Sequence, residues 1–169
     1  MSVSVQQADF DIGAEIKALT DGQGDIGAVV SFTGLVRDLV EDANVDGKAD
    51  RQPPTLSAIT LEHYPAMTVP ALRAIEAEAM ARWPVRRVRI IHRFGTLHIG
   101  ENIVLVLTAS AHRQAAFEAA NFIMDYLKVR APFWKKETRA NDVSTWVEAR
   151  EHDARSAAQW QSRPHKDGR

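Results

Sequence analysis

Two strand-like runs joined by a short glycine-containing segment constrain the fold more than any other part of the chain. "VRRVRIIHRFG" (85–95) and "NIVLVLTAS" (102–110) are rich in β-branched residues and have the length of strands. "TLHIGE" joins them, and Gly95 and Gly100 suit the turn positions on either side. This hairpin-like connection favours antiparallel pairing over the parallel pairing of alternating strands and helices.

The next segment predicts the longest helix. Its apolar residues within 111–129 fall on one stripe, made of Ala115, Ala119, Phe122, Ile123 and Tyr126. Pro132 disfavours helical geometry at the residue before it, so the helix should end near Arg130. An extended segment, "FWKKETR" (133–139), should follow.

The remaining elements alternate between strands and helices. Strands are expected within 2–10, 26–34 (buried), 58–64 and 145–150, and helices over 11–19, 68–83 and 151–160. Some of these strands also follow one another directly, through hairpin-like connections. This pattern predicts an α+β fold with a mixed, mostly antiparallel sheet and packed helices.

Length and composition predict one globular domain. A chain of 169 residues that is 45% hydrophobic can bury a proper core. The domain should span residues 1–150, followed by a C-terminal helix and frayed tail over 151–169. Residues 38–57 are acidic, polar and proline-paired, so they predict a flexible surface loop, which is either a lid or a tolerated insertion.

Charge and motif content exclude several classes of protein. A net charge of −1 and a pI near 6.6 argue against a dedicated nucleic-acid binder. The absence of cysteine excludes disulfides, thiolate metal sites and cysteine nucleophiles on this chain. The six histidines lack metal-ligand spacing, and neither a P-loop nor a Gly-x-Ser-x-Gly elbow is present, so no metal or cofactor is expected. No membrane span or signal peptide is readable, which predicts a cytoplasmic protein without a membrane partner.

Basic residues gather at the end of the long helix, in "KVRAPFWKKE" (128–137). Lys128 suits the negative end of the helix dipole, so its position alone requires no function. Lys135 and Lys136 alternate along an extended segment, so only one of them can face the same side as Glu137. A lysine desolvated among aromatic rings would serve as an acid, a base or a nucleophile, whereas lysines on a solvated strand edge would only protect that edge.

A second basic group lies at the other end of the same helix. Ser110 is expected to cap the helix, which places His112 and Arg113 in its first turn. Either these cations and the helix amides form an anion pocket suited to phosphate, or both side chains turn into solvent. Arg113 and Lys128 are separated by roughly 22 Å along a helix, at about 1.5 Å per residue. The two groups therefore serve different sites, or a symmetric second copy brings them together.

Five segments of the sequence are similar to a known family. "GAVVSFTGLVRD", "LEHYPAMT", "RWPVRRVRIIHRFG", "SAHRQAAFEAANFIMDYLKVRAPFWKKE" and "WVEAR" together resemble MoaE, the large, catalytic subunit of molybdopterin synthase. The resemblance runs from about residue 25 to residue 150 and implies a fold of the α/β hammerhead type. It implies a sulfurtransferase that converts cyclic pyranopterin monophosphate into the dithiolene molybdopterin. It also implies a homodimer within a heterotetramer, whose small ubiquitin-like subunits donate sulfur from a C-terminal Gly-Gly thiocarboxylate.

The resemblance assigns roles to individual residues. Lys128 and Lys135 match the lysines that line the family's pocket, as catalytic residues. Residues matched to substrate binding are Phe32, Leu35, Val36, Arg37, His112, Arg113, Lys136, Glu137 and Arg150, with His112 and Arg113 coming from the other protomer. Position 35 is polar or basic in some relatives, and the loop over 38–57 is longer here. A non-catalytic anion-binding or RNA-binding module is the alternative that the basic groups leave open.

Overall fold

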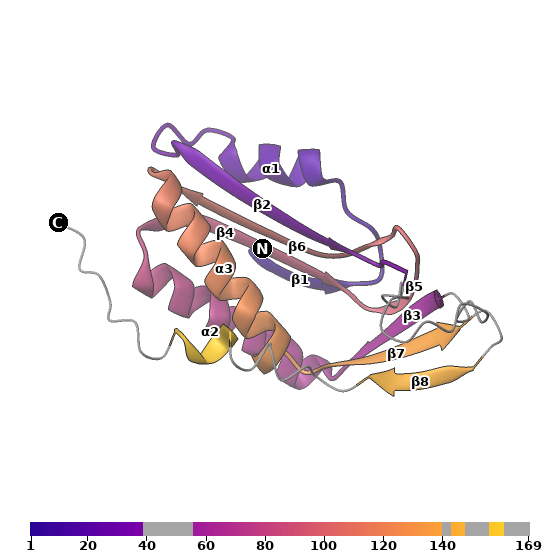
Figure 1. Cartoon of the computed structure of the whole chain (residues 1–169). Coiled ribbons are helices and arrows are strands. Elements are labelled where there is room, and N and C mark those ends of the chain that lie inside the picture. Colours follow the sequence, from indigo (N-terminus) through magenta and orange to yellow (C-terminus); the bar gives the residue numbers. More distant parts are fainter. Residues whose placement is uncertain (39–55, 140–142, 148–155, 161–169) are drawn as a thin grey trace, which may run out of the picture.

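The computed structural model describes residues 1–38, 56–139, 143–147 and 156–160 of the chain. In this part the elements follow the order β1 (Val3–Gln6), α1 (Ile12–Thr20), β2 (Ala28–Leu35), β3 (Leu56–His63), α2 (Pro65–Arg82), β4 (Val85–Arg93), β5 (Gly95–His98), β6 (Asn102–Ser110), α3 (Arg113–Arg130), β7 (Phe133–Arg139) and β8 (Ser144–Val147). They form two four-stranded sheets, with strand orders β1-β4-β6-β2 and β5-β3-β7-β8. Figure 1 shows the second sheet extending from one end of the first. Only β1 and β4 pair in parallel among the described strands, which confirms the predicted mixed, mostly antiparallel α+β fold.

The first sheet carries helices on both faces (Figure 1). Successive side chains of a strand point to opposite faces, so neighbouring residues of β4 and β6 enter different cores. Ile90 and Val106 pack in the cluster that contains the apolar residues of α2 and α3. Ile91 and Leu105 pack in the cluster with Leu19 of α1. Because both faces are covered, β6 reads as a nearly continuous apolar run, and the apolar residues of β4 occupy both of its faces.

The second sheet has its own small core. Val36, Leu56, Ile59, Leu61 and Leu97 are buried together beneath it. The chain enters this sheet between β4 and β6, as the short strand β5, which pairs with β3. The segment predicted as a simple connection is therefore partly a strand. The expected glycine turns are confirmed, because Gly95 and Gly100 adopt φ of 90° and 86°, a region that disfavours other residues.

Two elements differ from the sequence prediction. β2 was expected to be buried, but it is an edge strand whose Ser31, Phe32 and Leu35 are exposed. Its apolar run resembles a central strand, and within it Val29 does pack against the cluster that contains Leu19 of α1. Helix α2 begins at Pro65 rather than at residue 68, since proline suits the first helical position, where no amide hydrogen is needed.

The C-terminal region is only partly described. A helical turn at 156–158 falls inside the predicted helix 151–160, and residues 151–155 lie outside the described part. Trp160 is 3% exposed, and its ring lies 5.6 Å from that of Trp83 and 5.7 Å from that of Phe122. This turn is therefore part of the main core. Of the predicted loop over 38–57, residues 39–55 lie outside the described part, and Leu56 and Ser57 already belong to β3.

No helix in the described segments is long and apolar enough to cross a membrane.

Candidate active site

The alternation of β7 separates its two lysines. Residues 133, 135 and 137 pair with residues 63, 61 and 59 of β3, so the side chains of Lys135 and Glu137 lie on the sheet face that buries Leu61 and Ile59. Lys136 and Trp134 lie on the other face. Of the two lysines, Lys135 is therefore the one that shares a face with Glu137, and Lys136 instead points over the ring of Trp146, at 6.0 Å.

Lys135 is held by an ion pair and is not enclosed by aromatic rings. Its Nζ lies 2.6 Å from Oε1 of Glu137, and the two side chains are 38% and 12% exposed. The ring of Phe133 is stacked on His92 instead, and Trp134 faces away. Aromatic rings therefore do not desolvate Lys135. A largely buried carboxylate orients it instead.

Two histidines that the sequence analysis did not single out hold the start of β7. The ring of Phe133 stacks on His92 with centroids 3.7 Å apart, and it lies 5.9 Å from His63. Complete burial lowers the pKa of His92 to about 4, so the ring is neutral, and its Nδ1–H donates to the Arg93 carbonyl at 2.8 Å. Burial also lowers the pKa of His63. Two uncharged rings around Phe133 therefore anchor the strand that carries Lys135.

A buried hydroxyl anchors the residue before β7. The Thr68 hydroxyl in α2 lies 3.0 Å from the Tyr64 carbonyl and 3.3 Å from the Pro132 carbonyl, and Thr68 is fully buried. Helix α2 and the histidine rings thus fix the junction between α3 and β7 from two sides.

Lys128 lies on the exposed side of the last turn of α3, as the sequence predicts. Its neighbour Arg130 has a structural role, because its guanidinium stacks over the Tyr126 ring at 3.7 Å and lies 2.9 Å from Glu78. The helix ends at the C-cap Ala131, whose backbone N–H donates to the Leu127 carbonyl. The connection from α3 to β7 is short, so only seven positions along the chain separate Lys128 from Lys135.

The end of β2 meets the second sheet beside Lys135. Val36 is 3% exposed and packs against Leu61, the register partner of Lys135. Its backbone N–H donates to the Glu101 carbonyl, and its own carbonyl accepts from the Gly100 N–H, at 2.9 and 2.8 Å. Val36 thus anchors the strand end, and the side chain of Arg37 that follows is exposed.

The turn that receives Val36 is held by the buried Arg93. Its guanidinium donates to the Asn102 carbonyl at 3.0 Å and to the Glu101 carboxylate at 3.4 Å, and its Nε donates to the Gln7 carbonyl at 3.0 Å. Arg93 therefore ties β4, the end of β1 and the start of β6 to the turn that pairs with Val36.

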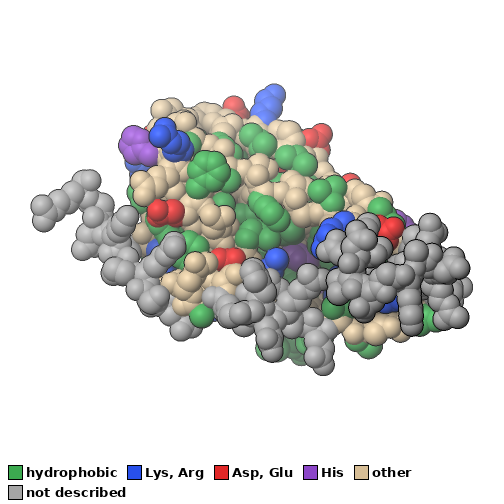
Figure 2. Space-filling view, in the orientation of Figure 1, with side chains coloured by type: hydrophobic (Ala, Val, Ile, Leu, Met, Phe, Trp, Pro, Cys, Tyr) green, Lys and Arg blue, Asp and Glu red, His purple; other side chains and the backbone are tan. Residues whose placement is uncertain are grey.

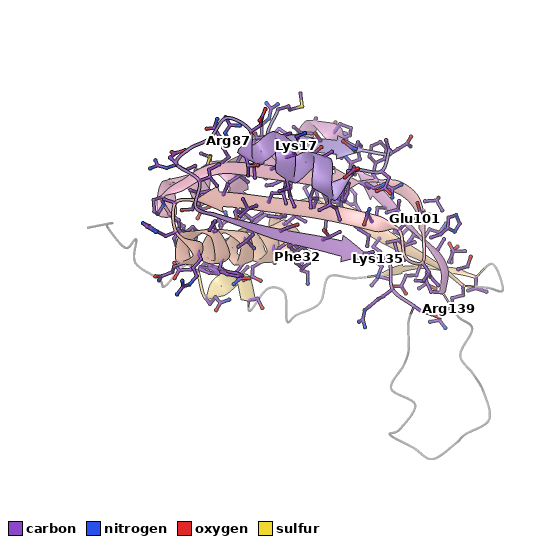
Figure 3. The ribbon with its side chains drawn as sticks, turned by 90° about the horizontal axis from the view of Figure 1, so that it is seen from above. Lys17, Phe32, Arg87, Glu101, Lys135 and Arg139 are labelled. Carbon is purple, nitrogen blue, oxygen red and sulfur yellow. The ribbon has the colours of Figure 1, made fainter. Side chains whose placement is uncertain are left out.

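Phe32 and Leu35 lie on the solvent side of β2, 40% and 52% exposed. The pairing of β2 with β6 shifts register between Gly34 and Leu35, which bends the strand end. Figure 3 shows Phe32 and Lys135 on one side of the molecule and Lys17 of α1 on the other. Phe32 opens onto a hollow of about 260 Å³. A second hollow, of about 390 Å³, lies between α1, α2 and the N-terminus and contains none of the predicted site residues.

His112 and Arg113 lie at the opposite end of α3. His112, rather than Ser110, occupies the N-cap position, and its side chain makes no capping bond. Ser110 is the last residue of β6, and its hydroxyl donates to the Pro84 carbonyl at 2.9 Å and accepts from the backbone N–H of His112 at 3.4 Å. Both His112 and Arg113 are exposed. One copy of the chain therefore carries Lys128 in the last turn of α3 and Lys135 on the strand that follows, and it leaves His112 and Arg113 at the other end of the helix, roughly 22 Å away.

The two remaining expectations concern Arg150 and a metal site. Arg150 lies outside the described residues. Within the described ranges, no group of three or more histidine, aspartate or glutamate side chains is placed to hold a metal ion.

Comparison with known proteins identifies the family. The family model described as "MoaE protein" matches residues 5–130. The chain belongs to the MoaE family. A curated relative from Mesorhizobium japonicum, "Molybdopterin synthase catalytic subunit", is 54% identical over 95% of this chain and 94% of its own length. Family membership thus makes this MoaE chain an enzyme subunit of molybdenum cofactor biosynthesis, and the alternative of a non-catalytic binding module finds no support.

Solved structures agree with the fold of this MoaE chain. The MoaE protein from Burkholderia ambifaria has a TM-score of 0.76 and 42% identity, with 96% of this chain and 99% of that chain covered. A Helicobacter pylori structure, a complex of subunits 1 and 2 of molybdopterin-converting factor, has a TM-score of 0.66, with 89% and 92% covered. Its identity of 20% shows likeness of fold alone.

Proposed function

We propose that this chain is the sulfur-transferring subunit of a molybdopterin synthase. Its substrate is cyclic pyranopterin monophosphate, into which two sulfur atoms are inserted while the cyclic phosphate opens. The sulfur donor is the C-terminal thiocarboxylate of a small ubiquitin-like subunit, and no cofactor is needed. A donor on a partner's tail suits a chain without cysteine, since this chain offers no thiol to carry sulfur.

The observation that carries the proposal is the oriented ion pair at the convergence of β2, α3 and β7. Lys135 is held by a carboxylate that is only 12% exposed, on a strand fixed by buried rings. A cation held in this way can stabilise developing negative charge without reorganising first. Lys128 lies at the end of the helix that leads into this strand.

The residues divide into two groups by role. Lys128 and Lys135 polarise the carbonyl of the thiocarboxylate and assist proton transfer. Arg37, together with His112 and Arg113 of a second copy and Arg150, holds the phosphate of the pterin, because guanidinium groups bind phosphate through paired, charge-assisted hydrogen bonds. Phe32, Leu35, Lys136 and Glu137 border the substrate. The buried backbone of Val36 supports this wall from behind.

The assembly follows from the separation of the two basic groups. A homodimer supplies His112 and Arg113 to the site of its neighbour, and each copy binds one small subunit, which makes a heterotetramer in the cytoplasm. Residues 1–150 form the single domain of each copy, and the tail that follows is anchored through Trp160.

Reconstitution with a thiocarboxylated small subunit and the cyclic pterin tests the proposal. The wild-type chain should form dithiolene, and Lys128→Ala should abolish product while the circular dichroism spectrum and the dimer remain unchanged. Arg73→Ala, which removes an exposed cation of α2, is the matched control and should keep full turnover. Normal turnover by Lys128→Ala would reject the assignment of the site.

A further inference from the structure

Arg37 directly follows a residue that the fold holds in place. Val36 is 3% exposed and is buried with Leu56 and Leu97 in the small core of the second sheet. Its backbone N–H and its carbonyl are both hydrogen-bonded to the turn between β5 and β6. The backbone on the N-terminal side of Arg37 is therefore fixed by packing and by hydrogen bonds.

Asp38, on the other side of Arg37, is fixed through its side chain. Its Oδ1 accepts a hydrogen bond from the backbone N–H of Leu56 at 3.0 Å, although the two residues are 18 positions apart along the chain. Leu56 is 3% exposed and is the first residue of β3. Strand β5 pairs with β3 only over residues 58–61, so β5 does not reach Leu56. The aspartate thus supplies an acceptor to a buried amide beyond the end of β5.

This arrangement leaves the charge of Arg37 available. Among the residues that the structure describes, no carboxylate forms an ion pair with Arg37, although Asp38 follows it directly. The carboxylate of Asp38 is engaged by the Leu56 amide instead. A guanidinium group without a carboxylate partner keeps its donors for another anion, such as a phosphate.

Segment 36–38 is attached to the sheet that carries Lys135. Val36 packs in the same small core as Leu61, the register partner of Lys135. Figure 2 shows basic side chains at the right of this face of the molecule, next to the hydrophobic side chains that cover β2 and α3. A backbone that is fixed on both sides of Arg37 therefore presents its guanidinium from a defined place on the second sheet.

We propose that Asp38 is a positioning residue for Arg37, because its hydrogen bond to the Leu56 N–H fixes the backbone from which the guanidinium reaches the phosphate of the substrate. The proposal rests on the proposed function, in which Arg37 holds that phosphate. Asp38 itself does not touch the substrate. Its effect is one of conformational entropy, since a backbone residue that is already ordered loses little further freedom when the ligand binds.

Two substitutions separate the hydrogen bond of Asp38 from its charge. Asn keeps the Oδ1 acceptor and removes the negative charge, whereas Ala removes both. Asp38→Ala should raise KM for the cyclic pterin about tenfold with kcat nearly unchanged, because ordering one backbone residue on binding weakens binding by about that factor. Asp38→Asn should keep KM within about twofold of wild type. Asp21→Ala removes an exposed aspartate at the end of α1, and as the matched control it should keep the wild-type KM.

A double-mutant cycle tests whether Asp38 acts through Arg37. Arg37→Ala should raise KM by itself, and adding Asp38→Ala should raise it no further, because no guanidinium remains to be positioned. Increases in KM that multiply in the double variant would overturn the positioning role.

Hydrogen exchange and phosphate binding separate this proposal from the proposed reaction. Asp38→Ala should speed amide hydrogen exchange at Leu56, and Asp38→Asn should leave it unchanged. Inorganic phosphate, followed through the Nε–H resonance of Arg37, should bind about tenfold more weakly to Asp38→Ala than to the wild-type chain. These results with a wild-type chain that forms no dithiolene would keep the positioning role and refute the proposed reaction. Wild-type KM and wild-type phosphate binding by Asp38→Ala would overturn the positioning role and leave the proposed chemistry standing.

Discussion

Mixing two inactive variants should restore activity if the site is shared between copies. In a Lys128→Ala dimer or an Arg113→Ala dimer, every site lacks one cation. In a mixed dimer, one site lacks both cations and the other is complete. Random reassociation makes half of the dimers mixed, and each has one good site of two, so turnover should recover to about a quarter of the wild-type value.

The recovery is measurable only if each single substitution by itself lowers turnover well below a quarter of the wild-type value. Removing one group that stabilises charge in a transition state lowers turnover about 10²- to 10³-fold. Each parent variant should therefore retain about 1% of wild-type turnover or less. The two variants would be produced with different affinity tags, unfolded in urea, mixed and refolded, and assayed for dithiolene with the thiocarboxylated small subunit.

A second mixture provides the control. Lys128 and Lys135 lie at the same end of α3 in the same copy, seven residues apart. A mixed dimer of Lys128→Ala and Lys135→Ala chains thus contains no complete site and should stay inactive. Failure of the Arg113 and Lys128 mixture to recover, or equal recovery in the two mixtures, would refute a site built from both copies.

Three further predictions concern the elements that support the site. Trp160→Ala should lower the free energy of unfolding by about 3–5 kcal/mol in urea titrations, because it empties a core position and removes the bond to Asp125, whereas Trp160→Phe should lose less. Because burial lowers the pKa of His92 from 6.5 to about 4, its contribution to stability is complete above pH 6.5 and is lost as the pH falls toward 4. That loss amounts to about 3 kcal/mol, and His92→Gln should flatten the stability curve between these pH values, so an unchanged curve would contradict the assignment. Glu137→Gln should change unfolding free energy by less than about 1 kcal/mol, because Lys135 is partly solvated, yet lower turnover at least tenfold; equal turnover would show that the carboxylate does not orient Lys135.

Local signals in the sequence predicted the elements that carry the site. The apolar stripe of α3 and the break at Pro132 place β7 at residues 133–139, where the structure has it. The period of two in a strand shows that Lys135 and Lys136 face opposite sides, but the sequence does not tell which of them faces the core. That choice depends on the pairing of β7 with β3, a contact between residues distant along the chain.

The predictions that were wrong also depend on contacts between residues distant along the chain. β2 has the composition of a buried strand, and its exposure follows from its position at the sheet edge, which is a property of the whole fold. Ser110 has the side chain of a helix cap, but its backbone pairs with β2 and β4 as the last residue of β6, so the N-cap position moves on to His112. No sequence spacing links His63 to His92, so their shared role becomes visible only in the contacts that both rings make with Phe133.

The length of α3 has a consequence for how such a chain can change. Inserting one residue in the middle of this helix would move its ends apart by only about 1.5 Å, yet it would rotate Arg113 about 100° around the axis relative to Lys128. The two ends would then no longer point to the same side, so in the proposed homodimer Arg113 would turn away from the site of the neighbouring copy. If that site is shared, side chains in the middle of α3 can be exchanged for others of similar size, whereas a change in the number of residues between positions 113 and 128 should abolish turnover.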